Sequence, residues 1–97
     1  MRHLPRALLV LLLPAFLAAG CASTAALKKA DTAFGQAKAA GAESKAPFEY
    51  YAAEAYLDLA HHEKAEGERG SVIVEFSKKS EQYSAEALQK AGGGTKP

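Results

Sequence analysis

Apolar residues recur at helical spacing along most of the chain, but the N-terminus has a different pattern. Residues 1–6 form a short basic start, and residues 7–20 carry no charge. A basic segment followed by an apolar one is typical of a secretory signal peptide. A helix needs roughly 20 apolar residues to cross a bilayer, whereas this uncharged run has 14. We therefore expect residues 1–20 to be a signal peptide and not a membrane span.

Three later segments show apolar residues at three- and four-residue steps, which predicts helices. They cover residues 24–40, 46–66 and 71–91, and a glycine follows each of them. The short turn between the last two predicts antiparallel neighbours. The fold class is therefore all-α: a signal peptide, a short helix and an antiparallel helical hairpin. The helical domain would span residues 21–91, and a disordered tail, 92–97, would follow it.

Each predicted helix has one apolar stripe on which a core can form. In the first helix, for which Ser23 or Thr24 is a plausible N-cap, the stripe consists of Leu27, Ala30, Phe34 and Ala37. In the second helix it consists of Phe48, Ala52, Ala55, Tyr56 and Leu59. In the third helix it consists of Ile73, Phe76, Ser80, Tyr83 and Ala87. A polar turn, residues 42–45, separates the first two helices.

The opposite face of the second helix is predicted to meet solvent. It carries Tyr50, Glu54, Asp58 and His61. Because Tyr50 points away from the apolar stripe in this register, we interpret the face as a possible interaction surface. The alternative for the other aromatic residues of this helix is that they only supply bulk to an alanine-rich pair of helices.

The residues before Cys21 resemble the bacterial lipobox, in which small residues precede a cysteine that is lipidated and becomes the first residue of the mature chain. The segment that a signal peptidase would recognise is Leu17, Ala18, Ala19 and Gly20. Ala18 departs from the usual pattern, because leucine is commoner at its position. The alternative is ordinary secretory cleavage after Ala19, which would leave the thiol of Cys21 free.

The lipobox resemblance implies a membrane anchor made of acyl chains on Cys21. The next residues, Ala22 and Ser23, lack the aspartate that commonly retains such lipoproteins in the inner membrane. The resemblance therefore implies the periplasmic face of the outer membrane.

Composition changes this picture in two ways. The formal charge of +1 becomes −1 for residues 21–97, because Arg2 and Arg6 leave with the signal peptide. A chain this close to neutral lacks the basic face that nucleic-acid binding needs. Of the 77 residues that remain, 18 are alanine and only 14 are bulky apolar residues. Such a thin core often needs a partner or another source of stability.

Candidate chemistry is sparse. His61 and His62 with Asp58 form the cluster that suggests a metal ion. Asp58 and His62 are four residues apart and could both touch one ion, but two ligands do not close a zinc site. The sequence has no glycine-rich phosphate loop and no nucleophile elbow. Once Cys21 is lipidated, no cysteine remains as a nucleophile. We therefore expect no enzymatic activity and no cofactor.

Residues 46–60, which open with Ala-Pro-Phe-Glu-Tyr-Tyr, resemble small helical bacterial lipoproteins that form a domain of unknown function. The second half of that domain is matched by Phe76, Tyr83, Ala87 and Leu88. Such domains occur alone or ahead of an OmpA-like peptidoglycan-binding domain. The resemblance implies a helical fold and an envelope location, with no catalytic residues.

The expected function is therefore that of a lipid-anchored structural or adaptor module in the bacterial envelope. Its partners would be the membrane and either an envelope protein or a second copy, and no nucleic acid. The alternative is a small-ligand or metal-binding periplasmic module that uses His61, His62 and Asp58.

Overall fold

The computed structural model describes residues 4–67 and 69–92, with side chains from residue 21 onward. It contains four helices, α1 (Leu4–Ala39), α2 (Ala42–Lys45), α3 (Pro47–Glu66) and α4 (Gly70–Lys90). The described part of the chain has no strand, so the predicted all-α fold is confirmed. Helices α3 and α4 match the last two predicted segments to within one residue at each end. Residues 93–97 of the predicted tail and residues 1–3 of the predicted signal peptide lie outside the described residues.

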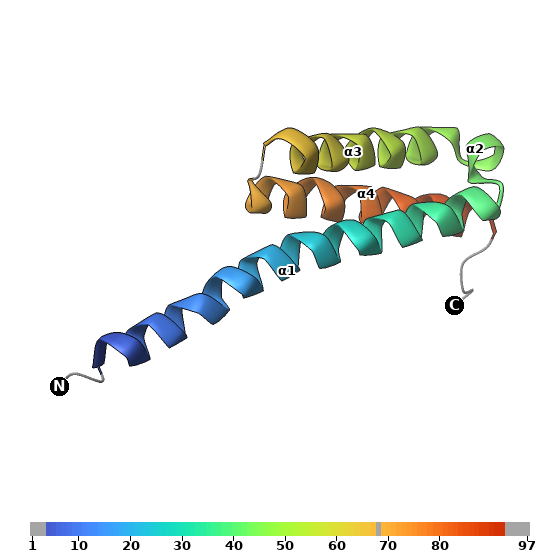
Figure 1. Ribbon diagram of the computed structural model, residues 1–97. Coiled ribbons are helices and arrows are strands. Elements are labelled where there is room, and N and C mark those ends of the chain that lie inside the picture. Colours follow the sequence, from blue (N-terminus) through green and yellow to red (C-terminus); the bar gives the residue numbers. More distant parts are fainter. Residues whose placement is uncertain (1–3, 68, 93–97) are drawn as a thin grey trace.

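Helix α4 lies in the middle of the molecule, between α1 and α3 (Figure 1). Helices α3 and α4 run antiparallel, as predicted, whereas α1 runs parallel to α4. The N-terminal part of α1 projects beyond the end of the bundle, which gives the molecule a length of 64 Å and a thickness of only 15 Å. The packed unit is therefore the second half of α1 together with α3 and α4.

Helix α1 differs from the predicted 24–40 at its start. It is one continuous helix from Leu4, so neither Ser23 nor Thr24 caps it. Ser23 is instead buried in the bundle. The physical reason is that the full sequence continues upstream with good helix formers such as alanine and leucine, so a helix start near residue 24 would require cleavage of the chain.

The connection between α1 and α3 also differs from the predicted polar turn. Gly41 has a left-handed φ of 80°, a conformation that glycine adopts at low cost, and it ends α1 as expected. The next four residues form the short helix α2, in which Ala42 is buried. Pro47 then begins α3, where its missing N–H leaves no helical hydrogen bond unmade.

Burial on all three long helices follows alternating four- and three-residue steps, which is the heptad spacing of a coiled coil. In α1 these positions are Ser23, Leu27, Ala30, Phe34 and Ala37. Along α3 and the residue before it they are Ala46, Tyr50, Ala53, Leu57 and Ala60. In α4 they are Ile73, Ser77, Ser80, Ser84 and Ala87. Most of these residues are small, so the heptads are hard to recognise in the sequence.

The inner side of α4 is a seam of serines. Ser77, Ser80 and Ser84 are completely buried, and they are the largest described side chains that are. The Ser80 hydroxyl donates a 2.8 Å hydrogen bond to the backbone carbonyl of Ala53 in α3. A short side chain can reach the backbone of the next helix only if the two helices are close together. The serine seam therefore sets a short distance between α3 and α4.

The bulky core residues form two clusters along the bundle. One cluster contains Leu27, Leu57 and Ile73, and the other is built around Tyr50 and Ala87. Phe34 packs against both clusters and so connects them. The three long helices all contribute to this small core.

Replacing Ser80 or Ser84 with alanine should change the free energy of unfolding in opposite directions. Ser80→Ala removes the hydrogen bond to Ala53 and should lower the free energy of unfolding by about 1 kcal/mol. Among the described residues the Ser84 hydroxyl is buried with no hydrogen-bond partner. Ser84→Ala removes this unsatisfied group and should raise the free energy of unfolding by up to about 1 kcal/mol.

Urea denaturation followed by circular dichroism measures both changes. Each variant deletes one oxygen from a fully buried serine, so the two serve as matched controls for each other. A change of the same sign in both variants would contradict the hydrogen-bond assignment.

Candidate functional site

The predicted interaction face of α3 is wrong at its central aromatic residue. Tyr50 is only 3% exposed and lies in the core, where its ring centroid is 4.9 Å from that of Phe34. Burial is also the main reason why the pKa of Tyr50 is raised above its ordinary value. Tyr50 is therefore a packing residue, and it is unavailable for an outward contact.

The other predicted face residues lie along the side of α3 that turns toward α1. Glu54 is half-buried, while Asp58 and His61 are exposed. The Nε2 atom of His61 lies 2.8 Å from a carboxylate oxygen of Asp31 in α1. This contact ties α3 to α1, so His61 has a structural contact inside the molecule.

The apolar stripe that was predicted for the core of α3 faces outward instead. Phe48 is 70% exposed and Leu59 is 45% exposed, with Ala55 exposed and Ala52 half-buried between them. We call these four residues the outer stripe. The exposed large hydrophobic residues of the described chain are Phe48, Tyr51 and Leu59, and all of them belong to α3. The predicted register is therefore wrong, and the reason is that α3 carries apolar residues on two faces.

Tyr56, the fifth residue of the predicted stripe, lies at the border between the outer stripe and α4. Its ring stacks on that of Tyr83 with a centroid distance of 5.9 Å and an interplanar angle of 6°. Phe76 contributes a second ring contact at 6.1 Å. The ammonium group of Lys79 lies 5.7 Å from the Tyr56 ring centroid, on its face, which is a cation–π distance. Aromatic contacts thus form the middle of the α3–α4 border.

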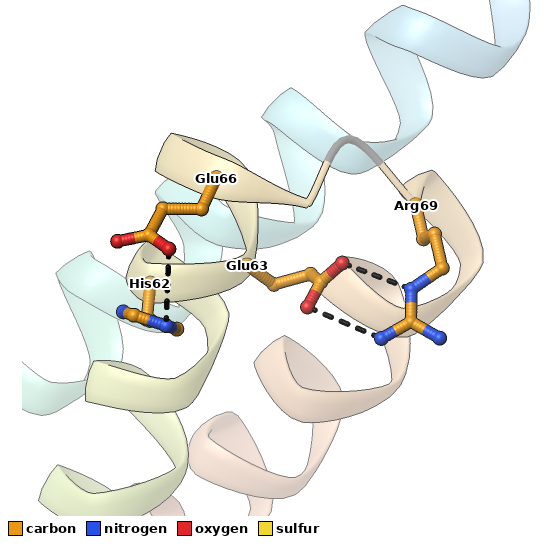
Figure 2. A network of polar contacts seen from close by, with 4 residues as sticks. All are labelled: His62, Glu63, Glu66 and Arg69. Atoms are coloured by element: carbon orange, nitrogen blue, oxygen red, sulfur yellow. Dashed lines mark hydrogen bonds and ion pairs between the residues drawn. The ribbon is translucent and has the colours of Figure 1, made fainter.

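Ion pairs close both ends of this border. At one end Lys90 donates a hydrogen bond to the nearly buried carboxylate of Glu49. This bond lowers the pKa of Glu49 and raises that of Lys90. At the other end the guanidinium of Arg69 donates to both carboxylate oxygens of Glu63, at 3.0 and 3.4 Å, and lowers the pKa of Glu63 (Figure 2).

The two sides of the outer stripe differ in charge. The side toward α4 exposes the basic groups of Arg69, Lys79 and Lys90. On the other side Tyr51 donates a 2.8 Å hydrogen bond to the carboxylate of Glu43, which raises the pKa of Tyr51. Asp58 follows Tyr51 by seven residues and therefore lies on this same side. Arg69 and Lys90 are paired with Glu63 and Glu49, so Lys79 is the cation on the α4 side that has no carboxylate partner among the described residues. We call the side of Lys79 the basic flank of the outer stripe and the side of Asp58 the acidic flank.

The predicted histidine cluster does not come together as a metal site. His61 faces Asp31, and the Nε2 atom of His62 lies 3.8 Å from a carboxylate oxygen of Glu66 on the next turn (Figure 2). Among the described residues no group of three or more histidine, cysteine, aspartate or glutamate side chains could hold a metal ion. No geometry in this part of the chain therefore favours the metal-binding alternative with Asp58.

Cys21 is exposed and lies close to the start of the packed region. Burial begins two residues later, at Ser23, and Lys28 and Lys29 are exposed on the next turns of α1. Lys29 also borders an open hollow with Lys78 of α4. Within the described residues no helix is long and apolar enough to span a membrane.

Comparisons with protein-family models, with curated proteins and with solved structures found no match. The resemblance to a lipoprotein domain of unknown function therefore stays a prediction, as does the lipobox at Cys21.

The charged flanks were not recognised in the sequence. Glu49, Tyr56 and Glu63 recur every seven residues in α3, and Arg69, Phe76, Tyr83 and Lys90 do so in α4. Two such series of opposite charge at their ends indicate a border between two neighbouring helices. The sequence therefore contains a pattern that predicts this border. The pattern can be recognised only if the small residues that lie between these positions are assumed to be buried.

The ion pair at Glu49 should make stability depend on pH. The folded-state pKa of Glu49 lies below its ordinary value, so the pair stabilises the fold above about pH 4.3, and this contribution is lost as the pH falls through the lower folded-state pKa. Glu49→Gln should therefore lower the melting temperature near neutral pH. Between about pH 6 and about pH 3 the melting temperature of this variant should fall by less than that of the wild type.

Thermal unfolding followed by circular dichroism at several pH values tests this expectation. Glu75→Gln, which changes an exposed carboxylate of α4, is the matched control and should keep the wild-type pH profile. An acid-induced fall that is as large in Glu49→Gln as in the wild type would contradict the expectation.

Proposed function

We propose that this protein is a lipid-anchored component of the bacterial cell envelope and acts as an interaction module. The observation that carries the proposal is the uncharged 14-residue run that leads through small residues to the single cysteine, Cys21. In this proposal a signal peptidase removes residues 1–20, and the Cys21 thiol carries a diacylglycerol group. The helical bundle acts by binding and not by catalysis.

Simple energetics support stable anchoring. Each methylene group that enters the membrane contributes about 0.8 kcal/mol, and stable attachment needs more than one acyl chain. A lipidated N-terminal cysteine carries more than one chain. The absence of aspartate at Ala22 and Ser23 supports the periplasmic face of the outer membrane as the location.

The position of Cys21 supports a bundle that lies close to the membrane surface. Because burial begins at Ser23, almost no linker separates the anchor from the packed helices. Lys28 and Lys29 follow within the next two turns, and Lys78 lies near Lys29 across the α1–α4 border. A lysine near an anionic membrane surface contributes about 1 kcal/mol to attachment. The basic residues near Cys21 therefore suit a surface of anionic phospholipid.

The outer stripe is the part of the molecule that best suits partner binding. Contiguous exposed apolar residues on a soluble domain commonly mark a contact surface. Phe48 and Leu59 lie at the two ends of this stripe, on the opposite side of α3 from the core residues Ala53 and Leu57. The interaction surface proposed here thus replaces the face that contained Tyr50.

Intact mass spectrometry of the membrane-extracted chain tests the anchor. We expect a chain that begins at Cys21 and carries covalently bound acyl chains. A Cys21→Ser variant should keep residues 1–20 and should lack the added lipid mass. An unmodified cysteine, or a chain that begins at Gly20, would contradict lipid anchoring and would indicate ordinary secretion.

A further inference from the structure

The outer stripe has the spacing of a helix-pairing surface. Its residues, Phe48, Ala52, Ala55 and Leu59, follow one another at steps of four, three and four. This is the spacing of the a and d positions in a coiled coil. Helix α3 therefore has two such seams, one buried against α4 and α1 and one that faces outward.

We propose that the outer stripe pairs with the same stripe of a second copy, with the two α3 helices parallel and in register. Phe48 then meets the partner's Phe48, and Leu59 meets the partner's Leu59. Ala52 and Ala55 in the middle of the stripe allow the two helix backbones to approach closely. The bulky residues at both ends fill the remaining space.

The charges beside the stripe favour the parallel orientation. In a parallel pair related by a twofold axis along the helices, the basic flank of one copy meets the acidic flank of the other. In an antiparallel pair, each flank meets its own kind. Lys79 lies over Tyr56 on the basic flank, and Asp58 lies on the acidic flank only two residues further along α3. The parallel pair thus brings Lys79 of one copy near the partner's Asp58, an attraction that sets orientation and register.

The parallel orientation also suits two copies in one membrane, and this step rests on the proposed lipid anchor. Parallel α3 helices place both Cys21 residues on the same side of the dimer. An antiparallel pair would place the two anchors at opposite ends of the dimer.

The small area of the outer stripe limits the strength of the proposed dimer in solution. Stable protein–protein interfaces bury about 1,200 Å² or more in total, and one short helix pair buries less than this. The dimer should therefore be weak in dilute solution. Anchoring confines the copies to one surface and raises their effective concentration, so the dimer should form in the membrane.

Disulfide crosslinking of the full-length chain in native membranes tests the proposal. A disulfide needs Cα atoms about 5.5–6 Å apart, which in-register parallel helices provide and distant positions do not. We expect Phe48→Cys alone and Leu59→Cys alone each to give a crosslinked homodimer on mild oxidation. Ala85→Cys, at an exposed alanine of α4, is the matched control and should give little. The unsubstituted chain controls for Cys21.

A charge exchange tests the orientation. In the Leu59→Cys chain, Lys79→Glu places like charges together and should reduce the crosslinked dimer about two- to fivefold, as expected for an exposed ion pair. Adding Asp58→Lys to the same chain should restore the dimer. Failure of the second change to restore it would contradict the parallel pairing of these flanks.

The remaining outcomes separate the dimer from the anchor. Crosslinking only in a mixture of Phe48→Cys and Leu59→Cys chains would show an antiparallel pair and overturn the proposal. If neither position crosslinks while Cys21 is lipidated, the proposed dimer is wrong and the proposed anchor is unaffected. The same conclusion follows if Leu59→Cys crosslinks to a different envelope protein. Self-crosslinking of the unsubstituted chain would show a free Cys21 thiol and contradict the anchor instead.

Discussion

The close approach of α3 and α4 is the constraint on which the rest of the structure depends. The buried side of α4 contains Ser77, Ser80 and Ser84, which have no exposed surface, and Ser80 reaches the backbone of Ala53. Larger residues at these positions would force the helices apart, because cores tolerate added volume poorly. Small residues bury little apolar surface each, so this design gains stability from close packing and from the high helix propensity of alanine.

Close packing of small residues leaves the larger side chains at the borders and on the surface. Tyr56 and Tyr83 stack along the edge between α3 and α4, and the ion pair of Glu49 with Lys90 lies at one end of that edge. The outer stripe of Phe48 and Leu59 stays exposed because the inner side of α3 is already filled. The same choice of residues that builds a thin bundle therefore also leaves an apolar surface exposed.

The helices could be predicted from the sequence, whereas the side of α3 that is buried could not. Glycines and Pro47 mark the helix ends through local backbone preferences, which the sequence states directly. Whether Leu57 or Leu59 lies in the core depends on which side of α3 faces the serine seam of α4. Serines are ordinarily predicted to face solvent, so the sequence did not indicate that the serine side of α4 is buried. The burial of Tyr50 depends on a different contact between helices, because Tyr50 packs against Phe34 of α1, 16 residues earlier in the sequence. The resemblance to a lipobox before Cys21 depends on the order of small residues along the chain and is independent of how the bundle packs.

The register of α3 is tested most directly by truncating two leucines that lie two residues apart. Leu57 is 8% exposed and Leu59 is 45% exposed. In dilute detergent solution, where the proposed dimer should dissociate, Leu57→Ala should lower the free energy of unfolding by about 2–4 kcal/mol, as expected for a buried leucine. Leu59→Ala should change it by no more than about 0.5 kcal/mol, as expected for a surface position. A larger loss for Leu59→Ala than for Leu57→Ala would show that the outer stripe is the true core and would contradict both the serine seam and the proposed interaction surface.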